Sequence, residues 1–324
     1  MYKNGPACSP LNPFYPAAAF TRDQRGCSVR DHADSKRAVS VASAGGQQFI
    51  VHTDTTRARV MAAEWGYSPT NGPDVWARLF PQAGGARQSP VDICTSIASS
   101  DSNLEMKKLT FAYESQSDLR ILNTGHGWKV EAPQSGSRLE GGPLGEDIYQ
   151  LEQFHCHWGE TSAEGSEHTV DGRAYAGELH LVHWNTTKYQ SFAEAAQHPD
   201  GLAVLGVFFD VGNESNDEIE KIVSTLSEIK FKGQFTDIPD VIDPTTFLPS
   251  GLGYWTYLGS LTTPPCNECV IWIVYKEPIT VTEEQLVQFR CLSACSGEAE
   301  EFIVKNYRPP QPLGNRALRE CNAA

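Results

Sequence analysis

Three histidines stand at positions that suit a shared metal ion. His155 and His157 are one residue apart in the run Phe154–Trp158, and His180 lies in the run Glu178–Val182. Both runs have the character of β-strands, in which residues two apart point to the same face of a sheet. His155 and His157 therefore share a face, and His180 can join them from a neighbouring strand. Three neutral imidazoles with an open fourth position are typical of a catalytic zinc ion, which indicates hydrolysis or hydration by metal-activated water.

Side chains beside these histidines strengthen the metal interpretation, because a lone His-x-His pair on a strand is usually incidental. Gln153 precedes His155 by two residues, and Glu178 precedes His180 by two. Each potential acceptor therefore shares a face with a histidine. Metal-binding histidines usually donate their second ring N–H to such an acceptor, which fixes the tautomer. Gln153 and Glu178 are thus predicted to support the metal ligands.

Other histidines are better explained without a metal. His183 follows His180 by three residues, so it points to the opposite face of the strand. Two histidines are expected to be hydrogen-bonded structural residues, namely His168 and His183. Three are expected to be exposed, namely His198, His32 and His52.

The elements that must position these residues are mostly strands. Candidate strands, rich in apolar residues, are Leu119–Asn123, Tyr149–Trp158, Glu178–Trp184, Leu202–Phe209 and Cys269–Tyr275. The last two are nearly continuous apolar runs, which predicts central strands covered on both faces. Capping signals and helical spacing predict three short helices, which begin at Ser191, near Ile219 and at Thr282. We expect one mainly-β domain over residues 64–324, with a large twisted sheet, short peripheral helices and long loops.

Charge and hydropathy bound the possible partners. Residues 1–63 carry eight Lys/Arg and four Asp, whereas residues 64–324 carry eighteen Lys/Arg and thirty-six Asp/Glu, a net charge of −18. Such an acidic domain argues against nucleic acid as a partner. No stretch approaches the roughly 20 apolar residues of a transmembrane segment. Residues 1–63 lack sustained periodicity, so we expect a disordered N-terminal extension or leader there.

Cysteine usage bears on location. The chain has nine cysteines, an odd number, and Cys156 and Cys269 fall within apolar strands. This pattern favours mostly buried free thiols and a reducing compartment. We expect a cytoplasmic protein, with mitochondrial or secreted location as the alternatives. Two glycosylation triplets begin at Asn185 and Asn213, but such triplets often arise by chance.

Longer motifs point to a known family. They are Arg87-Gln-Ser-Pro-Val-Asp-Ile93, Gly165-Ser-Glu-His-Thr-Val-Asp171 with Glu178-Leu-His-Leu-Val-His-Trp-Asn185, Ser260-Leu-Thr-Thr-Pro-Pro265 and Tyr307-Arg-Pro-Pro-Gln-Pro-Leu313. With these motifs the chain resembles the α-class carbonic anhydrases, particularly the animal cytosolic-type branch, over essentially all of Trp65 to Arg319. The resemblance implies a mostly antiparallel ten-stranded sheet with zinc at the base of a cone-shaped cavity. It also implies cis peptide bonds at Ser89-Pro90 and Pro264-Pro265, and we expect a monomer.

The resemblance implies the reaction and its participants. Zinc held by His155, His157 and His180 would carry a hydroxide that attacks CO2 and yields bicarbonate. Thr262 would accept a hydrogen bond from this hydroxide and donate its own proton to Glu167, an acceptor-only carboxylate when ionised.

Substrate-binding residues follow from the same resemblance. Thr263 would sit beside bicarbonate. An apolar wall for CO2 would consist of Val182, Val204, Leu261, Val270 and Trp272. Strand parity agrees, because Val182 shares a face with His180 and Val270 shares one with Trp272.

A proton must also leave the site. His126, in the run Asn123-Thr-Gly-His126, matches the proton shuttle of the family, and Tyr67 would help to hold the water chain. Histidine suits this role because its ordinary pKa is near 6.5. Two departures stand close by, since Thr124 and Lys129 occupy positions where well-studied members often carry asparagine. Lys129 adds a positive charge that is expected to depress the pKa of His126 and tune proton transfer.

The disulfide typical of extracellular members and the catalytic activity itself are each open to an alternative. Extracellular members typically join a cysteine before the Arg87 motif to one after the Ser260 loop. Here Cys266 fits the second position, but Ala83 stands near the first, so the usual bond is in doubt. The rival function is a catalytically weak carbonic anhydrase-related binding or matrix protein. Related binding modules typically lose zinc ligands, whereas this chain keeps all three, and the acidic repeat insertion of a matrix protein is not visible.

Overall fold

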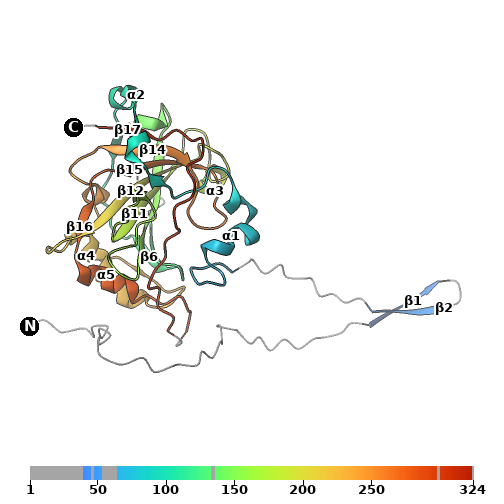
Figure 1. Ribbon diagram of the computed structural model, residues 1–324. Helices are drawn as coiled ribbons and strands as arrows, with labels where there is room; N and C mark the ends of the chain where they lie inside the picture. The colour runs from blue at the N-terminus through green and yellow to red at the C-terminus, as the bar shows by residue number, and fades with distance from the viewer. Residues whose placement is uncertain (1–38, 45–46, 53–63, 133–135, 298–299, 323–324) are drawn as a thin grey trace, which may run out of the picture. The chain divides into compact units, whose positions relative to one another are not determined.

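A mixed sheet organises the fold (Figure 1). The computed structural model describes residues 39–44, 47–52, 64–132, 136–297 and 300–322. Within them, 13 strands form this sheet, and ten follow one another in the order β13 (Phe235–Asp237), β6 (Arg120–Asn123), β7 (Trp128–Glu131), β9 (Tyr149–Trp158), β11 (Gly177–Asn185), β12 (Leu202–Val211), β15 (Val270–Tyr275), β14 (Tyr254–Gly259), β17 (Arg319–Cys321) and β4 (Ser99–Ser100). Three strands branch from this path, namely β16 (Ile279–Val281) on β12, β8 (Arg138–Glu140) on β9, and β5 (Thr110–Ala112) on β8. A small separate sheet pairs β10 (Thr169–Val170) with β3 (Asp92–Ile93).

The predicted strands are confirmed to within two residues of their expected ends. Pairing is mostly antiparallel, as expected, but β12 runs parallel to β15 and β16, and β17 runs parallel to β4. The two strands predicted to be central, β12 and β15, are buried along almost their whole length. Continuous apolar runs suit such strands because both faces are covered.

The sheet separates two apolar clusters. Leu181 on β11 packs into the larger cluster, whereas its neighbour Val182 packs into the smaller one. This alternation follows from the period of two in a strand. His180 shares parity with Val182, so the predicted metal ligands lie on the face of the smaller cluster.

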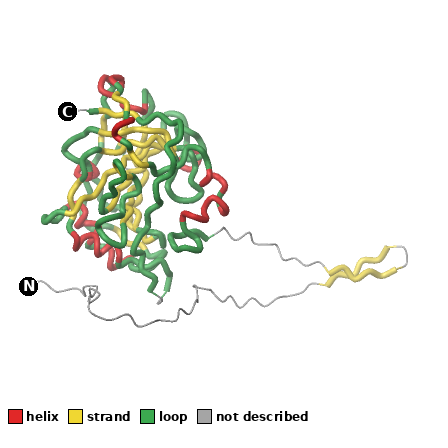
Figure 2. Tube along the Cα trace, in the orientation of Figure 1, coloured by secondary structure: helices red, strands yellow, loops and turns green. Residues whose placement is uncertain are grey.

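Short helices and loops surround the strands, as the red, yellow and green tube of Figure 2 shows. The helices are α1 (Pro73–Leu79), α2 (Ser102–Met106), α3 (Phe192–Ala195), α4 (Asp217–Val223) and α5 (Glu283–Arg290). The 3-10 turns are η1 (Pro81–Gly84), η2 (Thr95–Ile97), η3 (Gly142–Leu144), η4 (Leu226–Ile229) and η5 (Pro244–Phe247). The three predicted helices are confirmed as α3, α4 and α5.

The two predicted capping boxes differ. Thr282 and Gln285 form a full box at the start of α5. At α3, Ser191 accepts a hydrogen bond from the Glu194 amide, but the Glu194 carboxylate accepts from the amide of Gln190 instead. Ser89-Pro90 and Pro264-Pro265 are both cis, as the resemblance implied.

A hairpin is described ahead of the main unit. β1 (Val39–Ala44) pairs with β2 (Gln47–His52) in a unit of its own that covers residues 9–64. The sequence analysis did not identify these strands. The other residues of 1–63 lie outside the described residues, as do His32 and the side chain of His52. The expectation of disorder there stays a prediction.

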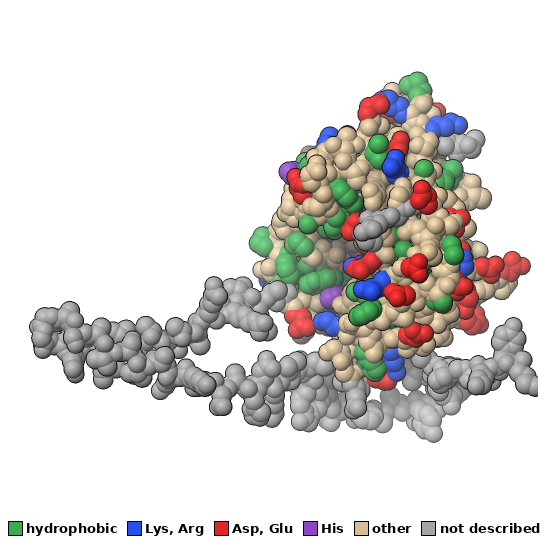
Figure 3. All heavy atoms as spheres, turned by 180° about the vertical axis from the view of Figure 1, so that it is seen from behind, with side chains coloured by type: hydrophobic (Ala, Val, Ile, Leu, Met, Phe, Trp, Pro, Cys, Tyr) green, Lys and Arg blue, Asp and Glu red, His purple; other side chains and the backbone are tan. Residues whose placement is uncertain are grey.

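The charges on the surface and the length of the helices are relevant to binding of nucleic acid and membranes. Acidic and basic side chains are interspersed over the face drawn in Figure 3. In the described part of the chain, no helix combines the length and the apolar character that a bilayer span needs.

Candidate metal centre

The structure brings the three predicted histidines together. His155 and His180 are direct partners in the antiparallel pair of β9 and β11, and His157 follows two residues along β9. One ring nitrogen or equivalent ligand atom from each lies within 4.8 Å of the others. The ring centroids are 4.7–5.2 Å apart. His157 and His180 are buried, and His155 is half-buried.

Two rings are held by the acceptors predicted from sequence. His155 donates from Nδ1 to Gln153 Oε1 at 2.8 Å, and His180 donates from Nε2 to Glu178 Oε1 at 2.8 Å. A donating nitrogen carries the proton, so the other nitrogen of each ring keeps its lone pair. These lone pairs are then available to a metal ion.

His157 carries the clearest sign that these rings can bind an ion. Its Nδ1 donates to the Asn306 carbonyl at 2.7 Å, whereas its buried Nε2 has no hydrogen-bond partner. Buried polar atoms are nearly always paired, so this orphan requires an explanation. Burial lowers the pKa of His157 to about 3, and it also lowers the pKa of His155 and His180. Three neutral nitrogens facing one point fit Zn²⁺, because a metal binds the deprotonated form of its ligands.

Glu178 is the hub of the support for these ligands. Its Oε1 accepts from the rings of His180 and His168 at 2.8 and 2.7 Å. Its Oε2 accepts from the backbone amides of Glu167 and His168 at 2.9 and 2.8 Å. Burial alone would raise the pKa of Glu178, but His168 and His180 together lower it below its ordinary value. Glu178 is therefore an ionised carboxylate that satisfies four donors.

This network continues to the loop that carries Thr262. His168 Nε2 lies 2.6 Å from the Tyr257 hydroxyl, which donates to Ser89 Oγ at 2.8 Å. The Ser260 amide also donates to Ser89 Oγ, at 3.0 Å. The candidate metal ligands and the Ser260 loop therefore share one buried hydrogen-bond network.

The remaining histidines behave as expected where they are described. His168 is part of the network above. His183 lies on the other face, with Nε2 2.7 Å from the Tyr113 hydroxyl and Nδ1 3.3 Å from the Ala203 carbonyl. His198 is exposed.

A cavity of about 200 Å³ opens beside the metal histidines. His155, His157 and Thr263 lie in its wall, together with Trp65 and Tyr67 from the start of the main unit. Burial and then the charge of Glu167 raise the pKa of Tyr67 well above 10, so its hydroxyl stays protonated.

His126 also lines this cavity, against one wall. Its ring stacks on Trp65 with centroids 3.7 Å apart, and its Nε2 donates to the Trp65 carbonyl at 2.8 Å. Thr124 Oγ1 donates to the Gly127 carbonyl at 2.9 Å and accepts from the His126 amide at 3.2 Å. Thr124, one of the two departures from the family pattern, thus shapes the loop that presents His126.

Thr262 and Glu167 are both buried and lie close to one another. Glu167 Oε1 accepts from the Arg308 amide at 2.8 Å, whereas Oε2 is buried without a partner. Burial raises the pKa of Glu167 well above its ordinary value, and the nearby Thr262 hydroxyl opposes this rise. Glu167 Oε2 is also 4.0 Å from His180 Nδ1. The two side chains are therefore close, and the relay between them stays a prediction.

The five residues of the expected apolar wall pack together in one cluster, but none of them is among the residues that line the cavity of about 200 Å³. Val182, Val204, Val270 and Trp272 are buried in the smaller cluster, and Leu261 packs against it. The Trp272 indole meets the His180 ring edge-on, with centroids 4.8 Å apart. Trp272 Nε1 donates to the Ser260 carbonyl at 3.0 Å. This wall therefore adjoins a metal ligand on one side and the Ser260 loop on the other.

Sequence reasoning missed Asn306. Its carbonyl orients His157, its Oδ1 accepts from the Trp158 amide at 2.7 Å, and its Nδ2 donates to the His126 carbonyl at 2.9 Å. Asn306 stands one residue before the Tyr307 motif, in a segment without strand or helix. No periodicity marked it.

Arg308 was quoted within a motif but given no role. Its amide holds Glu167, and its buried guanidinium donates to Gln88 Oε1 and the Ser89 carbonyl at 2.8 Å and to the Ala83 carbonyl at 2.9 Å. One residue thus joins the early Arg87 motif to the carboxylate beside Thr262. No signal in the sequence marked this role.

Cysteines and glycosylation triplets can now be placed. Six described cysteines are free, and five of these are buried. Burial raises the pKa of Cys266 to about 11, whereas Cys291 is disulfide-bonded. Asn185 is fully buried and its amide donates to Asp147 at 3.0 Å, whereas Asn213 is exposed.

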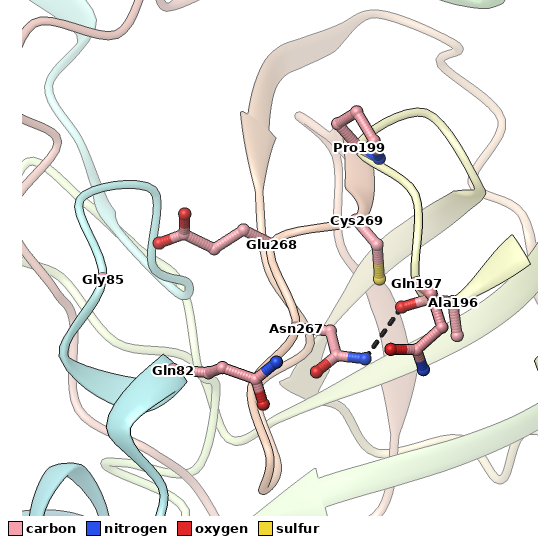
Figure 4. A pocket seen from close by; sticks show the side chains of 8 residues that line it. All are labelled: Gln82, Gly85, Ala196, Gln197, Pro199, Asn267, Glu268 and Cys269. Carbon is pink, nitrogen blue, oxygen red and sulfur yellow. Dashed lines mark hydrogen bonds between the residues drawn. The ribbon is translucent and has the colours of Figure 1, made fainter.

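A second cavity, of about 290 Å³, is larger but lacks histidine (Figure 4). Asn267 projects into it and donates to the Ala196 carbonyl at 2.8 Å. The Asn267 carbonyl accepts from the Leu261 amide at 2.9 Å, which ties this cavity wall to the Ser260 loop. Size alone therefore does not identify the reactive site in this protein.

Comparison with known proteins agrees with the motifs. Residues 71–322 match the family model of eukaryotic-type carbonic anhydrase. The chain is 48% identical over 261 residues to carbonic anhydrase 1 of Mus musculus, a match that covers 80% of this chain and 98% of the mouse protein. The enzyme class expected from the resemblance, carbonate dehydratase, is thereby confirmed. The chain belongs to the eukaryotic-type carbonic anhydrase family.

Proposed function

We propose that this chain catalyses the zinc-dependent, reversible hydration of CO2 to bicarbonate and a proton. The observation that carries the proposal is the buried, unpartnered His157 Nε2 beside the rings of His155 and His180. Zinc bound there would supply a Lewis acid that lowers the pKa of its water to about 7, as it does in carbonic anhydrases generally.

The supporting residues fix the ligand geometry. Gln153, Glu178 and the Asn306 carbonyl each accept one ring N–H, so the three histidines present lone pairs without rearrangement. Preorganised ligands of this kind keep one coordination position open for the reacting water.

Thr262 and Glu167 orient the attack. An ionised carboxylate only accepts hydrogen bonds, so Thr262 must donate to Glu167 and keep its oxygen lone pairs for the attacking water. A zinc ion held by the three histidines would favour the ionised form of Glu167, which opposes the effect of burial on its pKa. Thr262 would then direct a lone pair of the water toward the apolar wall, where no polar side chain competes with CO2 for it.

We expect CO2 and bicarbonate to contact different residues of the site, CO2 the apolar wall and bicarbonate the polar part of the cavity. Val182, Val204 and Trp272 offer a dry surface that suits neutral CO2. Thr263 lines the cavity beside the histidines, where its hydroxyl suits the charged oxygens of bicarbonate.

His126 is proposed to carry the proton to bulk buffer. Its ring is stacked on Trp65, so it must swing away from this wall to meet water near the metal. Tyr67 stays protonated and offers a hydroxyl to the water chain.

Stopped-flow CO2 hydration tests the proposal. Zinc-loaded protein should show rapid hydration that a zinc chelator abolishes and added zinc restores. A His126→Ala variant should be slowed most in weak buffer and recover in concentrated buffer, because external base replaces the shuttle. Absence of chelator-sensitive hydration would favour the alternative of a binding or matrix protein, and equal rates in weak buffer would remove His126 from the mechanism.

The predicted cytoplasmic location and monomeric state stay proposals. The six free thiols support a reducing compartment, whereas the disulfide-bonded Cys291 does not. Subcellular fractionation and size-exclusion chromatography with light scattering decide these two points.

A further inference from the structure

Lys129 and Glu131 form an ion pair at the edge of the metal cavity. Lys129 Nζ lies 2.8 Å from Glu131 Oε1, and the side chains are 32% and 41% exposed. The two residues share one face of β7, because the alternate residues Trp128 and Val130 are buried in the larger cluster.

Strand register places this pair beside the metal ligands. In the antiparallel pair of β7 and β9, Lys129 is opposite His155 and Glu131 is opposite Gln153. Cross-strand neighbours have Cβ atoms about 5 Å apart. Lys129 lines the cavity itself, so its charge lies close to the site compared with the Debye length of about 8 Å at physiological ionic strength and acts there with little screening.

Lys129 is the cation of this cavity. Among the described residues that line it, Lys129 is the only Lys or Arg, and none is Asp or Glu. Glu131 does not line the cavity, but it forms the ion pair with the Lys129 ammonium. Glu152 is a third charge nearby: burial raises its pKa most, a hydrogen bond with Trp184 and then the charge of Lys129 lower it, and the charge of Glu131 raises it.

We propose that the Lys129–Glu131 pair sets the affinity of the cavity for small anions, with Lys129 attracting them and Glu131 limiting that attraction. The inference rests on the proposed function, in which CO2 is neutral and bicarbonate is the anionic product. The pair therefore acts on product retention and on inhibition by monovalent anions. Its charge distinguishes the two directions of the reaction, since only dehydration begins with an anion.

Thiocyanate binding to the zinc-loaded protein tests this proposal, with isothermal titration calorimetry as the readout. Lys129→Gln should weaken thiocyanate binding about two- to fivefold, the range of a partly exposed charge interaction. Glu131→Gln should strengthen binding by a similar factor, because it releases the ammonium. The double variant should behave like Lys129→Gln, since Glu131 acts through Lys129.

A matched control uses the ion pair of Lys107 and Glu146, also 2.8 Å long but absent from the cavity lining. Lys107→Gln should leave thiocyanate affinity unchanged. Equal affinity of the wild-type and Lys129→Gln proteins would overturn the proposal, as would a loss of affinity in Glu131→Gln. If even the wild-type protein showed no zinc-dependent thiocyanate binding while CO2 hydration persisted, the pair would have no anion to control. If hydration were absent too, the proposed function itself would fail.

Discussion

Replacement of Glu178 by glutamine tests how the fold supports its metal site. The carboxylate accepts four hydrogen bonds of 2.7–2.9 Å, from the rings of His168 and His180 and from the amides of Glu167 and His168. Glutamine has the same shape but presents one oxygen and one amide group, which donates. In either orientation, two of the four donors therefore lose their acceptor.

The magnitude follows from this count. A hydrogen bond to a charged group contributes about 1.5–3 kcal/mol, so losing two destabilises the apo fold by about 3–6 kcal/mol. His180 can avoid part of this loss only by changing tautomer, which puts a proton on Nδ1, the nitrogen left for the metal. Outer support of metal ligands is typically worth about 10–100-fold in metal affinity. Zinc binding by Glu178→Gln is therefore expected to weaken by at least tenfold.

Two measurements check this prediction. Chelator competition gives the zinc dissociation constant, and urea unfolding of the apo protein gives its stability. Gln153→Glu is the matched control, because it retains an acceptor for His155 Nδ1 and should keep zinc affinity within a few-fold. Wild-type zinc affinity together with a wild-type unfolding midpoint in Glu178→Gln would refute the view that this carboxylate holds His180.

Three further predictions address the reaction, the pH dependence and modification. Thr262→Val keeps the side-chain volume but removes the hydroxyl beside Glu167, so kcat/KM for CO2 hydration should fall about 100-fold with little change in zinc affinity; an unchanged stopped-flow rate would contradict this. Burial lowers the pKa of His183 to about 4, so its contribution to apo stability is complete above pH 6.5 and is lost as the pH falls toward 4, by about 3 kcal/mol. Urea unfolding between pH 7.5 and 4.5 should show a shallower loss in His183→Gln, and parallel curves would exclude His183 as the source. If the chain is sent through a secretory pathway, a glycosidase-sensitive mass shift should disappear in Asn213→Gln and persist in Asn185→Gln, because the Asn185 amide is buried; the opposite pattern would show that modification precedes folding.

The strands and the metal histidines were predictable because their information is local. The period of two places His155 with His157, and Gln153 and Glu178 beside their histidines, without knowledge of the fold. Burial on both faces was likewise evident in the apolar run that became β12.

The contacts that complete the site were not predictable in this way. Asn306 is 149 residues from His157, and Arg308 is 141 residues from Glu167. Both lie in a segment without regular structure, so no periodicity constrains which way they face. Thr262 and Glu167 show the same difficulty. Their motifs identify both residues, but the sequence does not fix how the Thr262 hydroxyl is placed relative to the Glu167 carboxylate.

Asn306 and Arg308 follow the metal histidines by more than 100 residues along the chain, which has a consequence for biosynthesis. Domains emerge from the ribosome N-terminal part first. Strands β9 and β11 can therefore pair, and bring their histidines together, before residues 306–308 have been made. During that interval the His157 ring lacks the carbonyl that orients it, and Glu167 lacks its amide donor. The nascent chain would thus hold an immature ligand set until residues 306–308 are made, and we expect metal binding to follow their synthesis.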